Sequence, residues 1–284
     1  MLAVVVVHER DIEQVEAWSQ LQAALHVDAA RTDGLRLVHV LVYDNSRTPR
    51  AKAAGAVAHC SYVQNPQNGG TAAAYVSAAN LAQQLGLNWL LLLDHDTRLP
   101  SRFFEQASVA VEDAGLTHPA AALLPWVYHG DRVVSPARIT WTGSVRPLNP
   151  RVAVSDGSPL TGIASGSLIE VTAWRAIEPL PPGLWLDYVD HWTFARLRAL
   201  GRRIVVFDAK LEHDLSIATP SSVGRGRMQS ILDGERSFVG VLPWPARVLH
   251  PLRLALRLGR QVFKYPRGAL DLLSWMLWRR GNDT

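Results

Sequence analysis

The sequence predicts an α/β fold with a mostly parallel central sheet flanked by helices. Over the first hundred residues, short apolar runs alternate with longer segments of helical periodicity, and this alternation is typical of a doubly wound sheet. The chain has 284 residues, of which 48% are hydrophobic, so it can bury one large core. In such a sheet ligands bind beyond the carboxyl ends of the strands, where we expect the functional residues.

Each expected element of the first hundred residues has its own signal. The run LAVVVV is short, continuous and rich in β-branched residues, as in a strand buried on both faces. Ile12, Val15 and Trp18 then recur at helical spacing. A later Ala-rich helix begins after two glycines and ends at a third. The expected order is a strand over 2–7, a helix over 11–27, a strand over 36–46, a helix over 68–86 and a strand over 88–96.

The pattern continues less regularly after residue 100. Apolar runs and helical periodicity are still visible, but turns and short strand-like pieces separate them. A Ser- and Gly-rich stretch late in the chain predicts a mobile loop. The expected elements are a helix over 101–115, irregular structure over 119–162, a strand over 162–171, a helix over 185–201, a strand over 202–214 and the mobile loop over 216–236.

The last part of the chain, 237–284, has its own charge pattern. The net charge is only +4, but residues 247–280 contain eight Lys or Arg and one acid, Asp271. A helix here would align four cations in one stripe with leucines beside it; they are Arg253, Arg257, Arg260 and Lys264. Such an amphipathic helical tail is typical of a membrane interface. The alternative is a helix packed on the rest of the chain with its basic face in water.

Two carboxylates follow the most apolar strand. The run WLLLL leads directly into Asp94, His95 and Asp96. Because burying an unpaired carboxylate is costly, this pair should lie at an opening, hold a cation, or both. Carboxylates separated by one residue suit Mg²⁺ or Mn²⁺, and the alternative is a turn with solvated carboxylates. Asp44 ends an earlier strand and should reach the same edge.

Several short motifs occur in one consistent order: AVVVVHER, VLVYDNS, NGGTAAA, LLLLDHDT, ASGSLI, LWLDYVDHWTFARLRALG and then His213. In this order the chain resembles family 2 glycosyltransferases of the GT-A fold, most closely the rhamnosyltransferase and galactofuranosyltransferase branch. The resemblance covers about residues 1–215. It implies a Rossmann-like nucleotide-sugar half over about 1–100 and an acceptor half over about 101–215.

The resemblance implies a metal site at the end of strand 88–96. Asp94 would serve the ribose and metal region, Asp96 would bind the metal directly, and His213 would complete the site. The cation, Mg²⁺ or Mn²⁺, would neutralise the leaving diphosphate. A lone histidine is more often structural, but a neutral imidazole just after a strand is a plausible ligand.

The resemblance also implies the residues that bind the donor. Asp44 would accept a hydrogen bond from the base of a UDP- or dTDP-sugar, and the alternative is a turn cap formed with Asn45 and Ser46. Gly70 would let the backbone approach the donor at a helix start, and the alternative is a simple tight turn. His8, just after the first strand, would contact the nucleotide.

Asp190 is the expected general base. An inverting transfer needs one carboxylate to take the proton of the acceptor hydroxyl. Asp190 follows Tyr188 and Val189 at an expected helix start, where the ionised form is favoured. Asp187 is the alternative for this role. Relatives often carry an acidic residue soon after this Asp, whereas this chain has His191.

The sequence therefore predicts an inverting, metal-dependent glycosyltransferase, a hexosyltransferase acting in cell-surface polysaccharide assembly. L-rhamnose is favoured through the branch, and the acceptor would be a saccharide or a lipid-linked glycan. A sugar-nucleotide nucleotidyltransferase is an alternative, although residues 4–14 lack the basic Gly-rich loop of that class. A non-catalytic protein that binds membrane surfaces is a second alternative.

Localisation is expected to be cytoplasmic, peripheral on the inner face of the plasma membrane, with membrane contact through the tail. Neither a leader peptide nor an apolar stretch of membrane-spanning length is visible. The single Cys60 excludes an intramolecular disulfide and a cysteine zinc site. The aromatic residues do not form a base-stacking pattern, so no nucleic-acid partner is expected.

Overall fold

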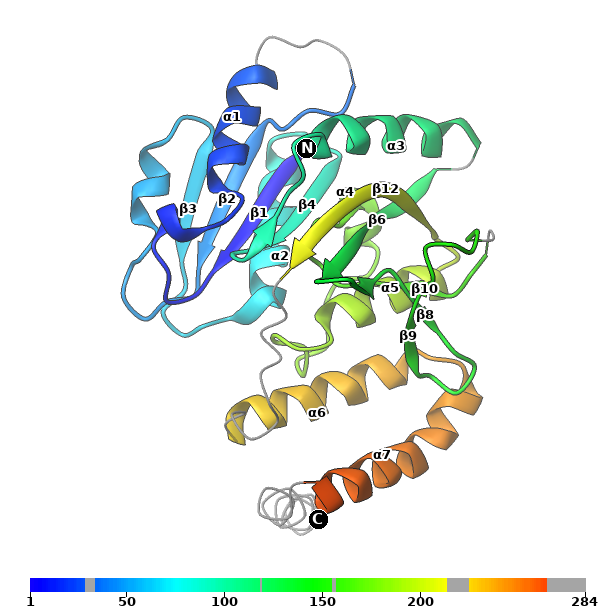
Figure 1. The fold of residues 1–284 in the computed structure, drawn as a ribbon. Coiled ribbons are helices and arrows are strands. Elements are labelled where there is room, and N and C mark those ends of the chain that lie inside the picture. Colours follow the sequence, from blue (N-terminus) through cyan, green and yellow to red (C-terminus); the bar gives the residue numbers. More distant parts are fainter. Residues whose placement is uncertain (29–33, 118, 155–156, 214–224, 265–284) are drawn as a thin grey trace.

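The computed structural model describes the chain except residues 29–33, 118, 155–156, 214–224 and 265–284 (Figure 1). A nine-stranded mixed sheet forms the centre, with helices on both faces and a small three-stranded sheet beside it. The predicted α/β fold with a mostly parallel central sheet is confirmed.

The order of the central sheet places the two strands that end in Asp44 and Asp94 on either side of the first strand. β1, β2, β3 and β4 run parallel, whereas β11 runs antiparallel to both of its neighbours, β4 and β6. In spatial order the strands are β3 (Cys60–Gln64), β2 (His39–Asp44), β1 (Leu2–Val7), β4 (Trp89–Asp94), β11 (Leu168–Glu170), β6 (Ala120–His129), β12 (Arg203–His213) and β5 (Thr97–Arg98), with β7 (Arg132–Ser135) beside β6. The small sheet contains β10 (Leu160–Thr161), β8 (Ala137–Ile139) and β9 (Val145–Pro147).

Strand register brings the predicted strand-end residues to one edge. Val7 is the parallel partner of Asp44, and Val6 is the partner of Asp94. β12 runs parallel to β6, so its last residues reach the same edge, where His213 pairs with Thr97 of β5. The sheet therefore delivers the ends of β1, β2, β4 and β12 to one side, as the alternating pattern predicts.

Successive residues of a strand point to opposite faces of the sheet. In this sheet both faces are buried, each by its own core cluster. Leu2, Val4 and Val6 belong to one core cluster, and Ala3, Val5 and Val7 belong to the other. The first cluster includes buried residues of α2 (Gly70–Gln84), α4 (Val171–Arg175) and α5 (Val189–Ala199). The second includes residues of η1 (Ile12–Gln14), α1 (Trp18–Asp28) and α3 (Phe103–Thr117).

Several elements differ from the sequence-based expectation; within 119–162, expected to be irregular, β6 is a ten-residue strand of the central sheet. The helix expected over 11–27 is broken into η1 and α1. The strand expected over 162–171 forms only as β11, because the chain turns at Gly166 with φ +76°. β3, preceded by η2 (Lys52–Ala56), was not predicted: it is a five-residue edge strand whose side chains are mostly half-buried, so its sequence shows little alternation.

The C-terminal part forms a helical pair below the sheet (Figure 1). α6 (Arg225–Gly240) packs on α5, and α7 (Trp244–Lys264) packs on α6. The prediction of a mobile loop over 216–236 is wrong for 225–236, which lie in α6. Phe238 and Val239, near the end of the same helix, join the core and anchor it there. Over the described residues, none of the helices combines the length and the apolar character needed to cross a membrane.

Candidate active site

Asp94 and Asp96 stand in a tight turn at the end of β4, and both are partly exposed. The backbone N–H of Asp94 donates to Thr97 Oγ1 at 3.1 Å, which closes the turn. Ser165 is fully buried, and its hydroxyl donates to Asp94 Oδ2 at 2.7 Å. Because Ser165 is buried and cannot move freely, its hydrogen bond holds the Asp94 carboxylate in one orientation.

The predicted metal ligands come from two strands. Pairing of His213 with Thr97 places its backbone beside the turn that carries Asp96. The side chain of His213 lies outside the described residues. Within the described part of the chain, no three His, Cys, Asp or Glu side chains are grouped closely enough to hold a metal ion. The carboxylate oxygens of Asp94 and Asp96 are nevertheless the donor type that Mg²⁺ and Mn²⁺ prefer, so the residues fit such a cation shared with substrate oxygens.

His95 shows which charges surround this turn. Burial lowers its pKa, while the carboxylates of Asp96 and Asp94 oppose that shift, and Arg10 and His8 add to it. His8, at the end of β1, is itself exposed. The ends of β1 and β4 thus bring together two acids, two histidines and an arginine, an arrangement that suits an anionic ligand accompanied by a cation.

Asp190 lies in the first turn of α5, where the expected base was placed. The helix begins after Tyr188, which has φ +65°, and Asp190 Oδ1 accepts the backbone N–H of His191 at 2.7 Å. His191 Nδ1 lies 2.9 Å from Thr161 Oγ1 of β10. The residue that departs from the family pattern is therefore in contact with the small sheet.

Asp187, the alternative base, has a different environment. Burial raises its pKa, Arg227 opposes this, and the charge of Asp190 adds to the rise. Arg227 Nη2, from α6, lies 3.7 Å from Asp187 Oδ1. Asp187 therefore faces the helical pair and already has a cation beside it.

Tyr75 connects the two halves of the site and was missed in the sequence. Its side chain is 1% exposed, and no hydrogen-bond partner for its hydroxyl is found among the described residues. Its pKa is raised well above the usual value, first by burial and then by Asp94 and Asp190. The charges of both carboxylates therefore act on this one buried hydroxyl. The only signal in the sequence was an aromatic residue in the Ala-rich helix that follows Gly70.

Gly70 is required by a close backbone approach. It has φ +68°, and a Cβ at this position would lie 2.1 Å from the carbonyl oxygen of Trp185. The same oxygen accepts the N–H of Ala72 at 3.2 Å, and Asn45 Nδ2 donates to the Gly70 carbonyl at 3.2 Å. Gly70 therefore joins the loop after β2 to the loop before α5; its contact with a donor stays a prediction.

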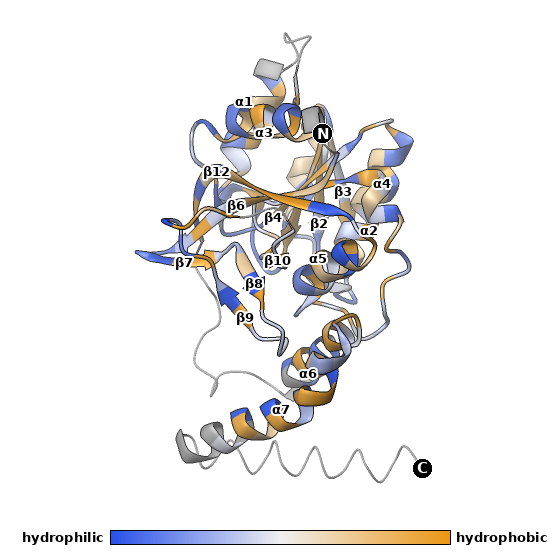
Figure 2. Cartoon of the chain, turned by 90° about the vertical axis from the view of Figure 1, so that its right-hand side faces the viewer, coloured by the Kyte–Doolittle hydropathy of each residue, from blue (hydrophilic) through white to orange (hydrophobic). Residues whose placement is uncertain are grey.

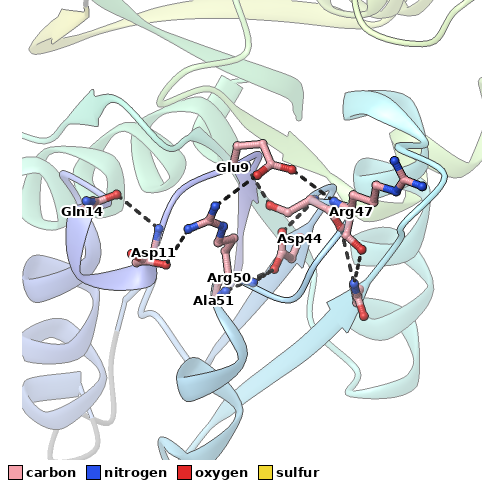
Figure 3. A network of polar contacts seen from close by, with 9 residues as sticks. Glu9, Asp11, Gln14, Asp44, Arg47, Arg50 and Ala51 are labelled. Atoms are coloured by element: carbon pink, nitrogen blue, oxygen red, sulfur yellow. Dashed lines mark hydrogen bonds and ion pairs between the residues drawn. The ribbon is translucent and has the colours of Figure 1, made fainter.

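Asp44 is fully buried at the end of β2 and forms the centre of a polar network (Figure 3). Its Oδ1 accepts the N–H of Ser46 at 2.9 Å, and its Oδ2 accepts from Arg50 N at 2.8 Å, Ala51 N at 3.1 Å and the Tyr62 hydroxyl at 2.8 Å. Burial tends to raise its pKa, but these hydrogen bonds hold the pKa below its usual value. This is a capping arrangement, the alternative that the sequence left open, and contact with a nucleotide base stays a prediction.

An exposed rim lies over this network. Glu9, with φ +52°, accepts the N–H of Arg47 at 3.3 Å and lies 3.6 Å from the Arg50 guanidinium. Its own N–H donates to Ser46 Oγ at 2.7 Å (Figure 3). The loops after β1 and β2 are therefore tied together directly above the buried carboxylate.

A separate cavity of about 810 Å³ lies along the first half of β12. Arg151, Arg198, Arg202 and Arg203 are among its lining residues, and none of the candidate site residues lines it. This cavity therefore lies apart from the strand ends that carry the candidate site residues.

Comparison with known proteins identifies the fold. No family model and no curated protein matches the chain. Among solved structures, GalNAc-T7 with UDP, GalNAc and Mn²⁺ matches with TM-score 0.50 and 16% identity over 75% of this chain and 43% of that one. TarS of S. aureus matches with TM-score 0.49 and 15% identity over 76% and 36%, and TarS 1-349 in complex with UDP-GlcNAc with 0.48 and 13% over 85% and 71%. The chain spans less than half the length of GalNAc-T7 and of the longer TarS chain. The similarity to the GalNAc-T7 structure confirms the predicted GT-A fold.

Proposed function

We propose that this protein is an inverting, metal-dependent glycosyltransferase that moves a sugar from a nucleotide-diphosphate donor to a saccharide or lipid-linked acceptor. The observation that carries the proposal is the gathering of the ends of β1, β2 and β4 at one edge of the sheet, where Ser165 holds Asp94 and where the charges of Asp94 and Asp190 both act on the buried Tyr75 hydroxyl. A carboxylate pair at a strand end and a separate carboxylate at a helix start, on one site, are the two acidic functions that such a transfer requires.

Asp190 acts as the general base. As the acceptor oxygen forms its bond to the anomeric carbon, the bond from that carbon to the diphosphate oxygen breaks and the hydroxyl proton passes to the Asp190 carboxylate. Asp190 stands in the first turn of α5, where its Oδ1 accepts the backbone N–H of His191. We favour Asp190 over Asp187 because the charges of Asp190 and Asp94 both act on the Tyr75 hydroxyl, whereas Asp187 lies beside Arg227.

The donor half is formed by the ends of β1 and β4. Asp94, oriented by Ser165, together with Asp96 and His213 would hold Mg²⁺ or Mn²⁺. When bound, the cation supplies positive charge for the leaving diphosphate. His8, Gly70 and Asp44 complete the donor side in this proposal.

The donor is proposed to be a UDP- or dTDP-sugar. GalNAc-T7, whose fold is similar, was solved with UDP and Mn²⁺, which supports this class of donor. L-rhamnose is favoured only by the resemblance of the sequence to the rhamnosyltransferase branch. The protein would then be a hexosyltransferase of cell-surface polysaccharide assembly, working in the cytoplasm at the inner face of the plasma membrane.

A donor-hydrolysis screen tests the proposal. Purified protein is incubated with dTDP-rhamnose, UDP-galactofuranose, UDP-glucose, UDP-galactose and UDP-N-acetylglucosamine, with Mn²⁺, Mg²⁺ or EDTA, and released nucleotide diphosphate is measured. We expect slow, metal-dependent release from one donor. Release should be lost in Asp96→Asn and Asp190→Asn but kept in Asp113→Asn, a control on the exposed side of α3.

Binding measurements decide the case in which no donor is hydrolysed. Titration calorimetry with UDP and dTDP, with and without Mn²⁺, should show metal-dependent binding that Asp96→Asn weakens. Absence of both binding and release would overturn the proposed function.

A further inference from the structure

α7 exposes a continuous row of large apolar side chains. Trp244, Val248, Leu252 and Leu256 are 69%, 65%, 60% and 56% exposed, and they follow one another at intervals of four residues. Pro251 and Ala255, which lie between them on the same side, are exposed too. In a helix these six residues cover one sector, and we call Trp244, Val248, Leu252 and Leu256 the α7 ridge. Figure 2 shows the helical pair below the sheet, with hydrophobic residues along α7.

The basic side chains on the other side of α7 are turned toward the protein. Arg253 Nη1 donates to the carbonyl oxygen of Thr142 at 2.6 Å. Arg257 makes two hydrogen bonds to the Glu235 carboxylate, at 3.1 and 2.5 Å, and His250 Nε2 lies 3.2 Å from the same group. The basic stripe was predicted to face either water or a membrane. Two of its arginines, Arg253 and Arg257, instead fasten α7 to the rest of the protein.

Glu235 fixes this orientation of α7. It is 5% exposed, and burial tends to raise its pKa, but His250 and Arg257 hold its pKa below the usual value. Rotating α7 to hide the ridge would leave this buried carboxylate without its two partners, which is strongly unfavourable. The apolar ridge is therefore held outward by the polar contacts of the opposite face.

We propose that the α7 ridge docks the protein on an anionic membrane surface. The ridge is convex and lies on a single helix, so it presents no groove for a peptide. Its four-residue interval rotates by roughly 40° per step, so it does not form the straight heptad seam of a coiled coil. A sector of this width, with a tryptophan at one end, suits the boundary between headgroups and acyl chains.

The charges around the ridge favour anionic lipid. α7 contains no Asp or Glu. Arg247 is exposed beside the ridge. An apolar sector that has a cation beside it and is free of acids is attracted to anionic headgroups and inserts its apolar side chains below them.

The position of the ridge gives the docking a consequence that rests on the proposed function. From the ridge inward the layers are α7, α6 and the start of α5, and α6 approaches so closely that a Cβ at Gly234 would lie 2.5 Å from the Asp187 carbonyl oxygen. With about 10 Å between packed helices, Asp190 would stand about 20 Å above the docked surface. A lipid-linked acceptor could reach the base from that surface.

Vesicle co-sedimentation of the full chain tests the docking surface. The vesicles contain phosphatidylcholine alone or with phosphatidylglycerol. We expect wild type to bind the anionic vesicles more tightly, and Val248→Ser/Leu252→Ser to bind at least about tenfold more weakly. The matched control, Leu85→Ser/Val109→Ser, removes two exposed apolar side chains from α2 and α3 and should bind like wild type.

Three results would overturn the docking. If wild type binds neither kind of vesicle, the protein makes no such membrane contact. If the ridge variant binds as tightly as wild type, the contact lies elsewhere on the protein. Light scattering that shows a wild-type dimer and a monomeric ridge variant, without lipid, would assign the ridge to a second copy of the chain. Donor hydrolysis in solution should be equal in all three proteins, so failure of docking and failure of the proposed function remain distinguishable.

A fluorescent label shows directly what covers the ridge. A polarity-sensitive dye is attached to Leu252→Cys in a Cys60→Ser background, with Arg102→Cys on the exposed start of α3 as the reference. The emission of the Leu252 label should shift to shorter wavelength only when anionic vesicles are added. A label already shifted without vesicles would mean that the protein itself covers the ridge, and docking would be rejected.

Discussion

Asp44 and Asp94 end strands on either side of β1, at the same edge of one sheet, yet their surroundings are opposite. Asp44 is fully buried and accepts four hydrogen bonds from the protein. Asp94 is partly exposed, and Ser165 donates to one of its oxygens. An apolar run that ends in aspartate thus produces either a buried carboxylate saturated with hydrogen bonds or a partly exposed one, depending on how many donors the neighbouring loops supply.

The largest effect should come from removing the buried carboxylate. Asp44→Ala leaves the N–H groups of Ser46, Arg50 and Ala51 and the hydroxyl of Tyr62 without their acceptor, and we expect a loss of about 3 kcal/mol in the free energy of unfolding. Chemical denaturation would measure it. Asp94→Ala should cost less, about 1 kcal/mol, because it leaves the buried Ser165 hydroxyl without this acceptor. Equal losses for the two variants would refute the contrast.

Activity should show the reverse order. Asp94→Asn should lower the turnover of the hydrolysed donor by about a hundredfold, because the carboxylate beside the diphosphate loses its charge. Its melting temperature should stay within a few degrees of wild type. Steady-state kinetics at saturating metal measure this. Full activity in Asp94→Asn would remove Asp94 from the donor site.

The acid dependence of stability tests the charge of Asp44. The folded-state pKa of Asp44 lies below its usual value. Its stabilisation is therefore fully present above the unfolded pKa, about 3.9, and is lost as the pH falls through the folded value. The difference in free energy of unfolding between wild type and Asp44→Asn should shrink from pH 5 toward pH 2. A difference that stays constant over that range would mean that the charge of Asp44 contributes nothing.

A smaller effect is expected from the residue that orients Asp94. Ser165→Ala removes the 2.7 Å hydrogen bond to Oδ2, and turnover should fall by about tenfold, or about 1.4 kcal/mol in activation free energy. Ser165→Thr, which keeps the hydroxyl, should recover part of the loss if the methyl group is accommodated. Unchanged turnover in Ser165→Ala would show that Asp94 needs no orienting partner.

The smallest effect on stability is expected at Tyr75. Its buried hydroxyl has no hydrogen-bond partner in the described part of the chain, so Tyr75→Phe should change the free energy of unfolding by less than about 1 kcal/mol. Donor KM and turnover, measured together, show whether the hydroxyl contacts the substrate. A large destabilisation would instead reveal a partner for the hydroxyl in wild type.

Much of the sheet was predictable because its signals are local. The runs that became β1, β2 and β4 carry continuous apolar residues, and the placement of Asp44 and Asp94 at one edge follows from parallel pairing. β3 was missed because an edge strand with half-buried side chains needs little apolar sequence. The helix of α6 was missed because its first turns are polar and its apolar residues join a core formed by distant segments.

The sequence by itself determined the alternation of strands and helices, the edge at which the acids gather and the amphipathic character of the tail, since each depends on residue spacing along one segment. Only the tertiary structure decided that Asp44 is buried, that the charges of Asp94 and Asp190 both act on the buried Tyr75 hydroxyl, and that Arg253 and Arg257 of α7 face inward. Those outcomes depend on donors and acceptors far away in the chain: Tyr62 for Asp44, and Glu235 for Arg257. Burial and partnership are properties of the packed molecule, because a polar group is stable inside only where another element supplies its partner.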